Sequence, residues 1–206
     1  MIPRLHTYFH LTLLVWLTVL SGCGSTETYS KKYYVFDAAR STESSRTQTD
    51  FTLDVPRLTI DSAFSGSGLV YRVGDSKYES DFYNEFLASP SAMVTDTIRN
   101  WLSMSRLFKR VLDPGSQIDP THIIEGNITA LYGDFREPSS PKATVEMRLF
   151  LLETETGQDP LPIFGKTYIS SIDIESEDPE GLVEALGRCL ATILSTLESD
   201  LAERLS

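Results

Sequence analysis

The sequence predicts an α+β fold, a single two-layer domain in which two main helices cover an antiparallel sheet. Three observations predict it. Segments with alternating apolar and polar residues follow one another without helices between them, two other segments have helical periodicity, and regular strand–helix alternation is missing. Strands that follow one another closely are expected to pair antiparallel, because short turns join only antiparallel neighbours. We expect this domain over residues 33–206.

The first half of the domain is expected to contain short strands separated by turns, because its aromatic and branched residues lie between small and polar ones. The expected strands lie at 33–37, 51–61, 69–73 and 76–87, with a Ser/Thr-rich loop at 40–50. Pro56 interrupts the second strand, since proline cannot donate a hydrogen bond to a ladder.

Two helices with recognisable starts are expected. Ser89 followed by Pro90 predicts an N-cap and a first helical residue, and apolar residues through Ser105 fall on one side. Asp178 and Pro179 begin the second helix, whose apolar stripe is Leu182, Leu186, Cys189, Leu190, Ile193, Leu197 and Leu201.

The segments between the helices predict strands at 106–112, 123–135, 143–153 and 163–174. Within the second of these, one side is expected to carry Ile124, Ile128, Ala130 and Tyr132.

The residues before the domain predict a lipoprotein signal peptide over 1–22. They combine Arg4, no acidic residue, an apolar run over 11–20 and small residues before Cys23. A membrane-spanning helix takes about 20 apolar residues, and this run is too short. Small residues before a cysteine resemble the bacterial lipobox. We therefore expect cleavage between Gly22 and Cys23, with a diacylglycerol and an N-acyl chain such as palmitate on Cys23 as the covalent groups and no cofactor.

Residues 23–32 are small and polar, which predicts a lipidated tether. Several acyl chains hold a protein on a membrane without spanning it, because each buried methylene contributes about 0.8 kcal/mol. Gly24 and Ser25 follow the cysteine, where Asp would favour retention at the inner membrane in bacteria whose sorting is understood. The expected location is the bacterial envelope, at the outer membrane and facing the periplasm.

Charge and residue usage limit the function. Cleavage removes one base, Arg4, and no acid, so 17 basic and 29 acidic residues leave a formal charge of −12. Such a surface repels nucleic acid, and no nucleic-acid partner is expected. The mature chain has one histidine, His122, expected as a solvated turn residue, and one cysteine besides Cys23, the Cys189 of the helical stripe. Neither a catalytic triad nor a zinc site follows from these two.

No catalytic or metal site is therefore expected, and the protein is expected not to be an enzyme. The acidic run at 173–180 lacks the glycine-pinned loop of an EF-hand, and a strand end entering a helix N-terminus explains its charges. One cluster has two open interpretations: Tyr71, Tyr78, Phe82, Tyr83 and Phe86. Aromatic residues are favoured in small cores and also in interfaces, so these form either core or a contact surface for a partner, a neighbouring protomer or a lipid tail.

Several short motifs, taken in their order along the chain, resemble those of the ABC-type transport auxiliary lipoproteins. They are 69–72, Tyr78, 82–86, Pro90 with its helix and 107–111, and the similarity extends from the strand at 33–35 through the last helix. The family commonly has Arg-Trp where this chain has Glu85-Phe86.

The resemblance implies an accessory, non-catalytic subunit of an ABC transporter, in contact with its permease and ATPase. The implied periplasmic partner is a substrate-binding protein of the mammalian-cell-entry (MCE) type, and the cargo is phospholipid or another hydrophobic molecule moved between inner and outer membranes. Ring-like self-association as a homo-oligomer is also implied, and no catalytic residues are carried over. A structural lipoprotein in outer-membrane or lipopolysaccharide assembly remains the alternative, because a fold alone does not decide function.

Overall fold

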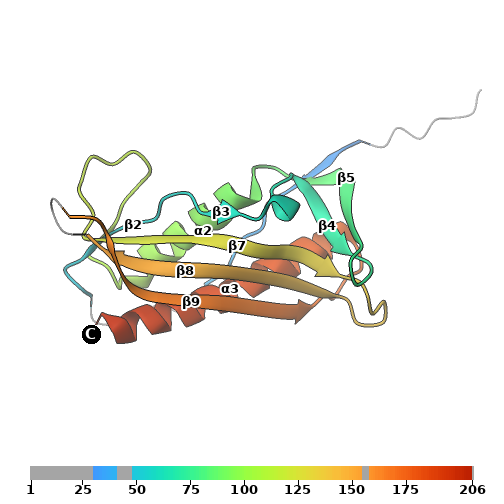
Figure 1. Cartoon of the computed structure of the whole chain (residues 1–206). Coiled ribbons are helices and arrows are strands. Elements are labelled where there is room, and N and C mark those ends of the chain that lie inside the picture. The colour runs from blue at the N-terminus through green and yellow to red at the C-terminus, as the bar shows by residue number, and fades with distance from the viewer. Residues whose placement is uncertain (1–29, 41–47, 155–157, 206) are drawn as a thin grey trace, which may run out of the picture. The chain divides into compact units, whose positions relative to one another are not determined.

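Three long strands form one side of the sheet (Figure 1). They are β7 (His122–Asp134), β8 (Lys142–Glu153) and β9 (Leu161–Asp173), and each pairs antiparallel with the next. The computed structural model describes residues 30–40, 48–154 and 158–205, so the predicted signal peptide, Gly22 and Cys23 lie outside the described residues. The antiparallel pairing expected from short connections is confirmed for these three strands.

Shorter strands continue the sheet on the other side of β7, and most of their pairings are parallel. They are β1 (Lys32–Tyr34), β2 (Thr52–Asp54), β3 (Thr59–Ile60), β4 (Gly68–Arg72), β5 (Tyr78–Phe86) and β6 (Arg110–Val111). β2, β3 and β4 pair in parallel with successive parts of β7, β1 pairs in parallel with β5 and β2 with β6, while β4 and β5 are antiparallel.

The α+β class is therefore confirmed, whereas the sheet is mixed rather than purely antiparallel. Parallel neighbours need long crossover connections. The chain from β4 to β7 supplies one, because it includes a whole helix. The strand expected over 106–112 is correspondingly short, with β6 covering two of its residues.

Two helices lie on the same side of the sheet (Figure 1). They are α2 (Pro90–Ser105) and α3 (Pro179–Arg204). Both predicted starts are confirmed: the Ser89 hydroxyl accepts the N–H of Ala92 at 3.4 Å, and the Asp178 carboxylate accepts the N–H of Gly181 at 2.7 Å. No helix in the described ranges is long and apolar enough to cross a membrane.

The main core lies between α3 and the long strands. Alternate residues of β8 are buried there: Ala143, Val145, Met147, Leu149 and Leu151. The expected stripe of α3 covers them, with Leu186, Cys189 and Ile193 buried as predicted. The Cys189 thiol contacts the Ala143 carbonyl oxygen at 3.3 Å, and burial raises the pKa of this thiol. Cys189 is thus a protonated core residue.

Two local expectations for β7 are wrong. Ile128 pairs with Met147 but Ala130 pairs with Glu146, so Thr129 is an extra residue in a β-bulge. The bulge moves Ala130 and Tyr132 to the face opposite Ile128, where Tyr132 stacks on Phe64 with 5.8 Å between ring centroids.

His122 is the other correction, because it is 2% exposed rather than solvated. β7 begins at this residue instead of after it, and Phe51 covers the ring at 4.3 Å. The Thr121 hydroxyl lies 3.0 Å from Nδ1. Burial lowers the pKa of His122, so its neutral form is the favoured one in the folded protein.

After β1 the chain crosses the helices and is clamped to both. The Arg40 guanidinium makes two bonds of 2.7 and 3.0 Å to the Glu198 carboxylate of α3, which also accepts the Trp101 indole N–H of α2 at 2.9 Å. Gly187 allows the crossing, since a Cβ there would overlap the carbonyl oxygen of Asp37. This clamp fixes β1, and the surface that β1 forms, on the rest of the domain.

Candidate partner-binding surface

The five aromatic residues singled out between 71 and 86 separate into buried and exposed groups. Phe86 is 4% exposed and packs edge-on against Phe36 at 5.4 Å. Tyr71 is half-buried, in ring contact with Phe135. Three of the five are exposed: Tyr78, Phe82 and Tyr83. The core interpretation therefore applies to Phe86 and Tyr71, and for the three exposed residues the contact surface stays a prediction.

A wide bulge in β5 causes this separation. Val70 of β4 lies opposite Ser80, and Gly68 lies opposite Glu85, so residues 81–84 stand against Leu69 alone. Gly68 permits the close approach, because a Cβ there would overlap the carbonyl oxygen of Asp81. Bulges re-aim side chains relative to regular alternation. Here the extra residues turn Phe82 and Tyr83 into solvent.

The Asp81 carboxylate holds the bulge together. It accepts the backbone N–H groups of Tyr83 at 2.8 Å and Asn84 at 3.0 Å, the Asn84 side-chain amide at 2.8 Å and the Tyr71 hydroxyl at 3.2 Å. Burial raises the pKa of Asp81, but these hydrogen bonds outweigh it and the pKa lies below the usual value. Burial raises the pKa of Tyr71 well above its usual value, so its hydroxyl stays a donor. The bulge is thus built around an ionised acid.

β1 extends the exposed apolar surface beside the bulge. Its parallel pairing sets Tyr34 beside Phe86 on the core side, where the Tyr34 hydroxyl donates to the Asn84 side chain at 3.0 Å. Alternate residues of the N-terminal chain therefore turn outward. The resulting group, called the N-terminal patch here, consists of Tyr33 (57% exposed), Val35 (60%), Phe82 (67%), Tyr83 (43%) and Leu87 (65%).

Lys31 joins the two parts of the N-terminal patch. Its ammonium group lies 4.5 Å from the centroid of the Phe82 ring and forms an ion pair with Glu85, which sits opposite Tyr33. Sequence reasoning missed Tyr33, Val35 and Leu87. The alternation of Tyr33 and Val35 with Tyr34 and Phe36 was visible, but the partner of that strand was not.

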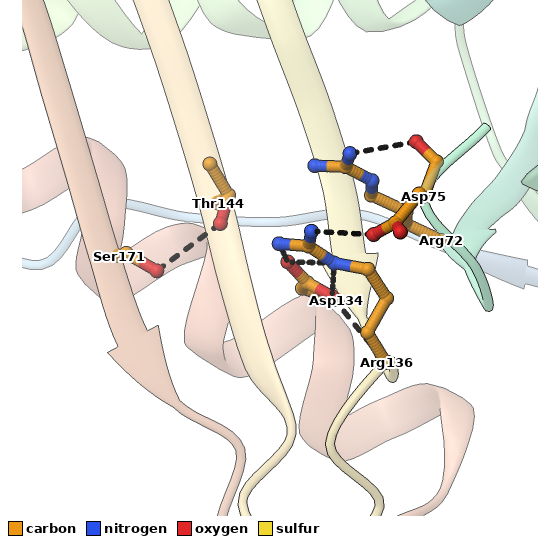
Figure 2. Close-up of polar contacts among 6 residues, drawn as sticks. All are labelled: Arg72, Asp75, Asp134, Arg136, Thr144 and Ser171. Atoms are coloured by element: carbon orange, nitrogen blue, oxygen red, sulfur yellow. Dashed lines mark hydrogen bonds and ion pairs between the residues drawn. The ribbon is translucent and has the colours of Figure 1, made fainter.

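A polar cluster at the ends of β4 and β7 contrasts with this patch (Figure 2). Arg136 binds the Asp134 carboxylate at 2.7 and 3.0 Å and reaches Asp75 at 3.5 Å, while Arg72 donates to the Asp75 carbonyl at 2.8 Å. The bonds from Arg136 lower the pKa of Asp134. The charges of Arg136, Asp134 and Asp75 thus compensate one another, and the neighbouring hydroxyls of β8 and β9, Thr144 and Ser171, pair with each other at 3.1 Å.

A shallow groove of about 620 Å³ lies on the same face of the sheet as this polar cluster, the face that the helices do not cover. It is lined by Pro56, Arg57, Thr59, Glu125, Gly126, Asn127, Thr129, Arg148 and Phe150. Arg148 lies over the Phe150 ring at 4.9 Å, and Arg57 contacts the Ser89 hydroxyl at 3.4 Å. Both arginines therefore have partners within the domain.

The acidic run before α3 has structural partners. Asp178 caps α3, Asp173 pairs with Lys142 at 3.5 Å and Glu175 with Arg188 at 3.4 Å. The described ranges contain no group of three or more His, Cys, Asp and Glu residues placed to hold a metal ion. The N-terminal patch, by contrast, is an exposed apolar surface that the packing of the domain does not explain.

Comparison with protein families matches residues 34–197 to the ABC-type transport auxiliary lipoprotein component. The matched range includes β5 with its bulge. Comparison with curated proteins found no match.

Solved structures resemble the fold. A Xanthomonas campestris protein of the DUF330 family is 15% identical, with 85% of this chain and 94% of that chain covered and a TM-score of 0.69. An uncharacterised protein is 14% identical, with 84% and 99% covered and a TM-score of 0.61. A hypothetical protein of Chlamydia trachomatis is 8% identical, with 76% and 98% covered and a TM-score of 0.54. At these identities the likeness concerns the fold alone.

Proposed function

This chain belongs to the family of ABC-type transport auxiliary lipoproteins, and from that premise we propose that it is an accessory subunit of an MCE-type transport system. In this proposal the domain faces the periplasm, is anchored through acyl chains on Cys23 at the outer membrane, and acts without catalysis. It helps move phospholipids or other hydrophobic molecules between the two membranes. The observation that carries the proposal is the family match, which covers residues 34–197.

The proposed contribution is geometric. A lipid anchor confines the domain to one surface and raises its effective concentration for a partner that reaches across the periplasm. The domain suits such a role because the chain after β1 is held on the helices: Arg40 pairs with Glu198, near the end of α3. A force or a partner acting on β1 would thus act on the whole domain.

Co-purification tests the proposal. The full-length protein with a C-terminal tag is produced together with the MCE protein, permease and ATPase of its own organism, and the complex is extracted in detergent. We expect the MCE protein to be recovered with the tagged chain. Cys23→Ser should keep this recovery in detergent but release the protein from membranes, because the fold does not depend on the acyl chains.

Two results would overturn the proposal. One is failure to recover any MCE protein when the lipidated chain is folded and present at the membrane. The other is recovery of lipopolysaccharide or outer-membrane assembly proteins instead, which would establish the structural alternative. A Cys23→Ser variant that still sediments with membranes would contradict the lipid anchor specifically.

A further inference from the structure

We propose that the N-terminal patch rests on the membrane that holds the anchor, with Phe82 and Tyr83 among the lipid headgroups. The patch stands directly beside the point where the predicted tether enters the domain. This inference rests on the proposed function in one respect: it requires acyl chains on Cys23.

Chain length keeps the patch near the lipid. Eight residues lead from Cys23 to Lys31, which span at most about 29 Å when fully extended. Because Lys31 lies 4.5 Å from the Phe82 ring, Phe82 stays within a similar distance of the anchor. α3 alone, with 26 residues, is about 39 Å long, so the tether is shorter than the domain.

The chemistry of the patch suits a membrane interface. Aromatic side chains with a polar edge favour the headgroup level, and exposed aliphatic ones gain from leaving water. Phe82 and Leu87 are among the most exposed large apolar side chains in the described ranges. The Lys31 ammonium group is paired with Glu85 at the patch, and the carbon stem of Lys31 covers apolar surface beside Phe82.

The acids of the bulge do not oppose this contact. An anionic membrane repels an acidic domain, so the face it accepts must have its carboxylates compensated. Glu85 is paired with Lys31, and Asp81 is turned inward onto backbone amides and the Tyr71 hydroxyl. The bulge thus presents apolar rings outward and keeps both of its negative charges occupied.

Brominated lipids provide the test. The mature lipidated protein is reconstituted into vesicles of phosphatidylethanolamine and phosphatidylglycerol that have brominated acyl chains, which quench tryptophan in contact with them. Phe82→Trp places a probe in the patch, and Met104→Trp places a matched exposed probe near the end of α2. Trp101 is buried in the core and supplies a constant background in both variants. Circular dichroism verifies that both variants fold.

We expect roughly twofold weaker probe emission for Phe82→Trp and little change for Met104→Trp, because interfacial side chains reach the acyl boundary. Equal quenching of both probes, or none at Phe82→Trp while the protein floats with the vesicles, overturns the inference and leaves the anchor intact. If the lipidated protein does not float, the anchor itself fails. If the Phe82→Trp emission shifts only when the MCE protein is added, the patch is a protein interface and the membrane contact is wrong.

Discussion

The region of β7 to β9 and the region of β1, β5 and β4 belong to one sheet, but different interactions determine their structures: apolar burial in the first and hydrogen bonds in the second. In the first, alternate apolar residues of β8 meet the apolar stripe of α3, so burial decides which side chain faces inward. In the second, the Asp81 carboxylate and its hydrogen bonds set the backbone path, and apolar rings are left in water. Apolar side chains that stay in solvent contribute no free energy of burial to the stability of the domain. An exposed apolar surface of this kind is what the proposed membrane contact requires.

The largest expected effect comes from the helix-covered region. Leu186→Asp should prevent folding, because it loses about 2–5 kcal/mol of packing and also buries an unpaired charge. Together these approach the whole stability of a domain, about 5–15 kcal/mol. Far-UV circular dichroism and urea unfolding measure the result. The control, Leu161→Asp at an exposed site, should stay folded. Cooperative unfolding of a soluble Leu186→Asp protein would mean that α3 does not cover the sheet.

The next effect concerns the clamp that joins the two regions. Glu198→Gln should lower the free energy of unfolding by about 3 kcal/mol, because Arg40 loses its buried carboxylate partner. Glu79→Gln removes one member of an exposed ion pair with Lys77 and should change stability by less than about 1 kcal/mol. Urea midpoints at constant slope give both numbers. Equal effects of the two substitutions would show that the Arg40–Glu198 pair stabilises the domain no more than an exposed surface ion pair does.

Within the region of β1, β5 and β4, replacing Asp81 should have the largest effect on stability. Asp81→Ala removes four hydrogen bonds from the bulge, and we expect a loss of about 1–3 kcal/mol because the site is only partly buried. Amide hydrogen exchange should quicken at Tyr83 and Asn84 while the β8 amides keep their protection. Asp75→Ala, at a highly exposed carboxylate, is the matched control. Unchanged exchange at Tyr83 would mean that Gly68 and the strand register alone hold the bulge.

The same division explains what the sequence predicted. The N-caps Ser89 and Asp178, the stripe of α3 and the antiparallel β7–β9 arrangement follow from local periodicity, and the structure confirms them. The parallel pairing of β1 with β5 joins residues about fifty positions apart, and no local pattern contains it. The bulge at Thr129 likewise has no sequence signature, so Ala130 and Tyr132 were assigned to the wrong face.

The candidate surface was only partly predictable for the same reason. Phe82 and Tyr83 were in the aromatic cluster, but the β5 bulge decides that they face solvent while Phe86 faces the core. Tyr33 and Val35 become part of the patch only through the pairing of β1 with β5. Local aromatic content therefore indicates which segment carries exposed aromatic residues, and nonlocal pairing decides which of them face solvent.

A smaller effect concerns pH and the start of β7. Burial holds the pKa of His122 below its ordinary value, so the unfolded chain takes up a proton before the folded one does. Stability should then be complete above about pH 6.5, fall as the pH drops below it, and level off below the folded pKa. His122→Phe should remove this dependence of the urea midpoint on pH. A wild-type midpoint that does not change between pH 7 and 5 would contradict the burial of this ring.

The smallest expected change in stability is also the sharpest test of the comparison. Phe82→Ser should alter the free energy of unfolding by only about 0.5–1 kcal/mol, because the ring is exposed in both states and loses mainly its contacts with Lys31 and Tyr83. Urea unfolding measures this, and Phe36→Ser, which opens the core beneath Phe86, is the matched control with a far larger loss. If Phe82→Ser cost as much stability as Asp81→Ala, the ring would be part of the packing that holds the bulge. The small value expected would instead show that the ring is not part of that packing, which leaves it available for the proposed membrane contact.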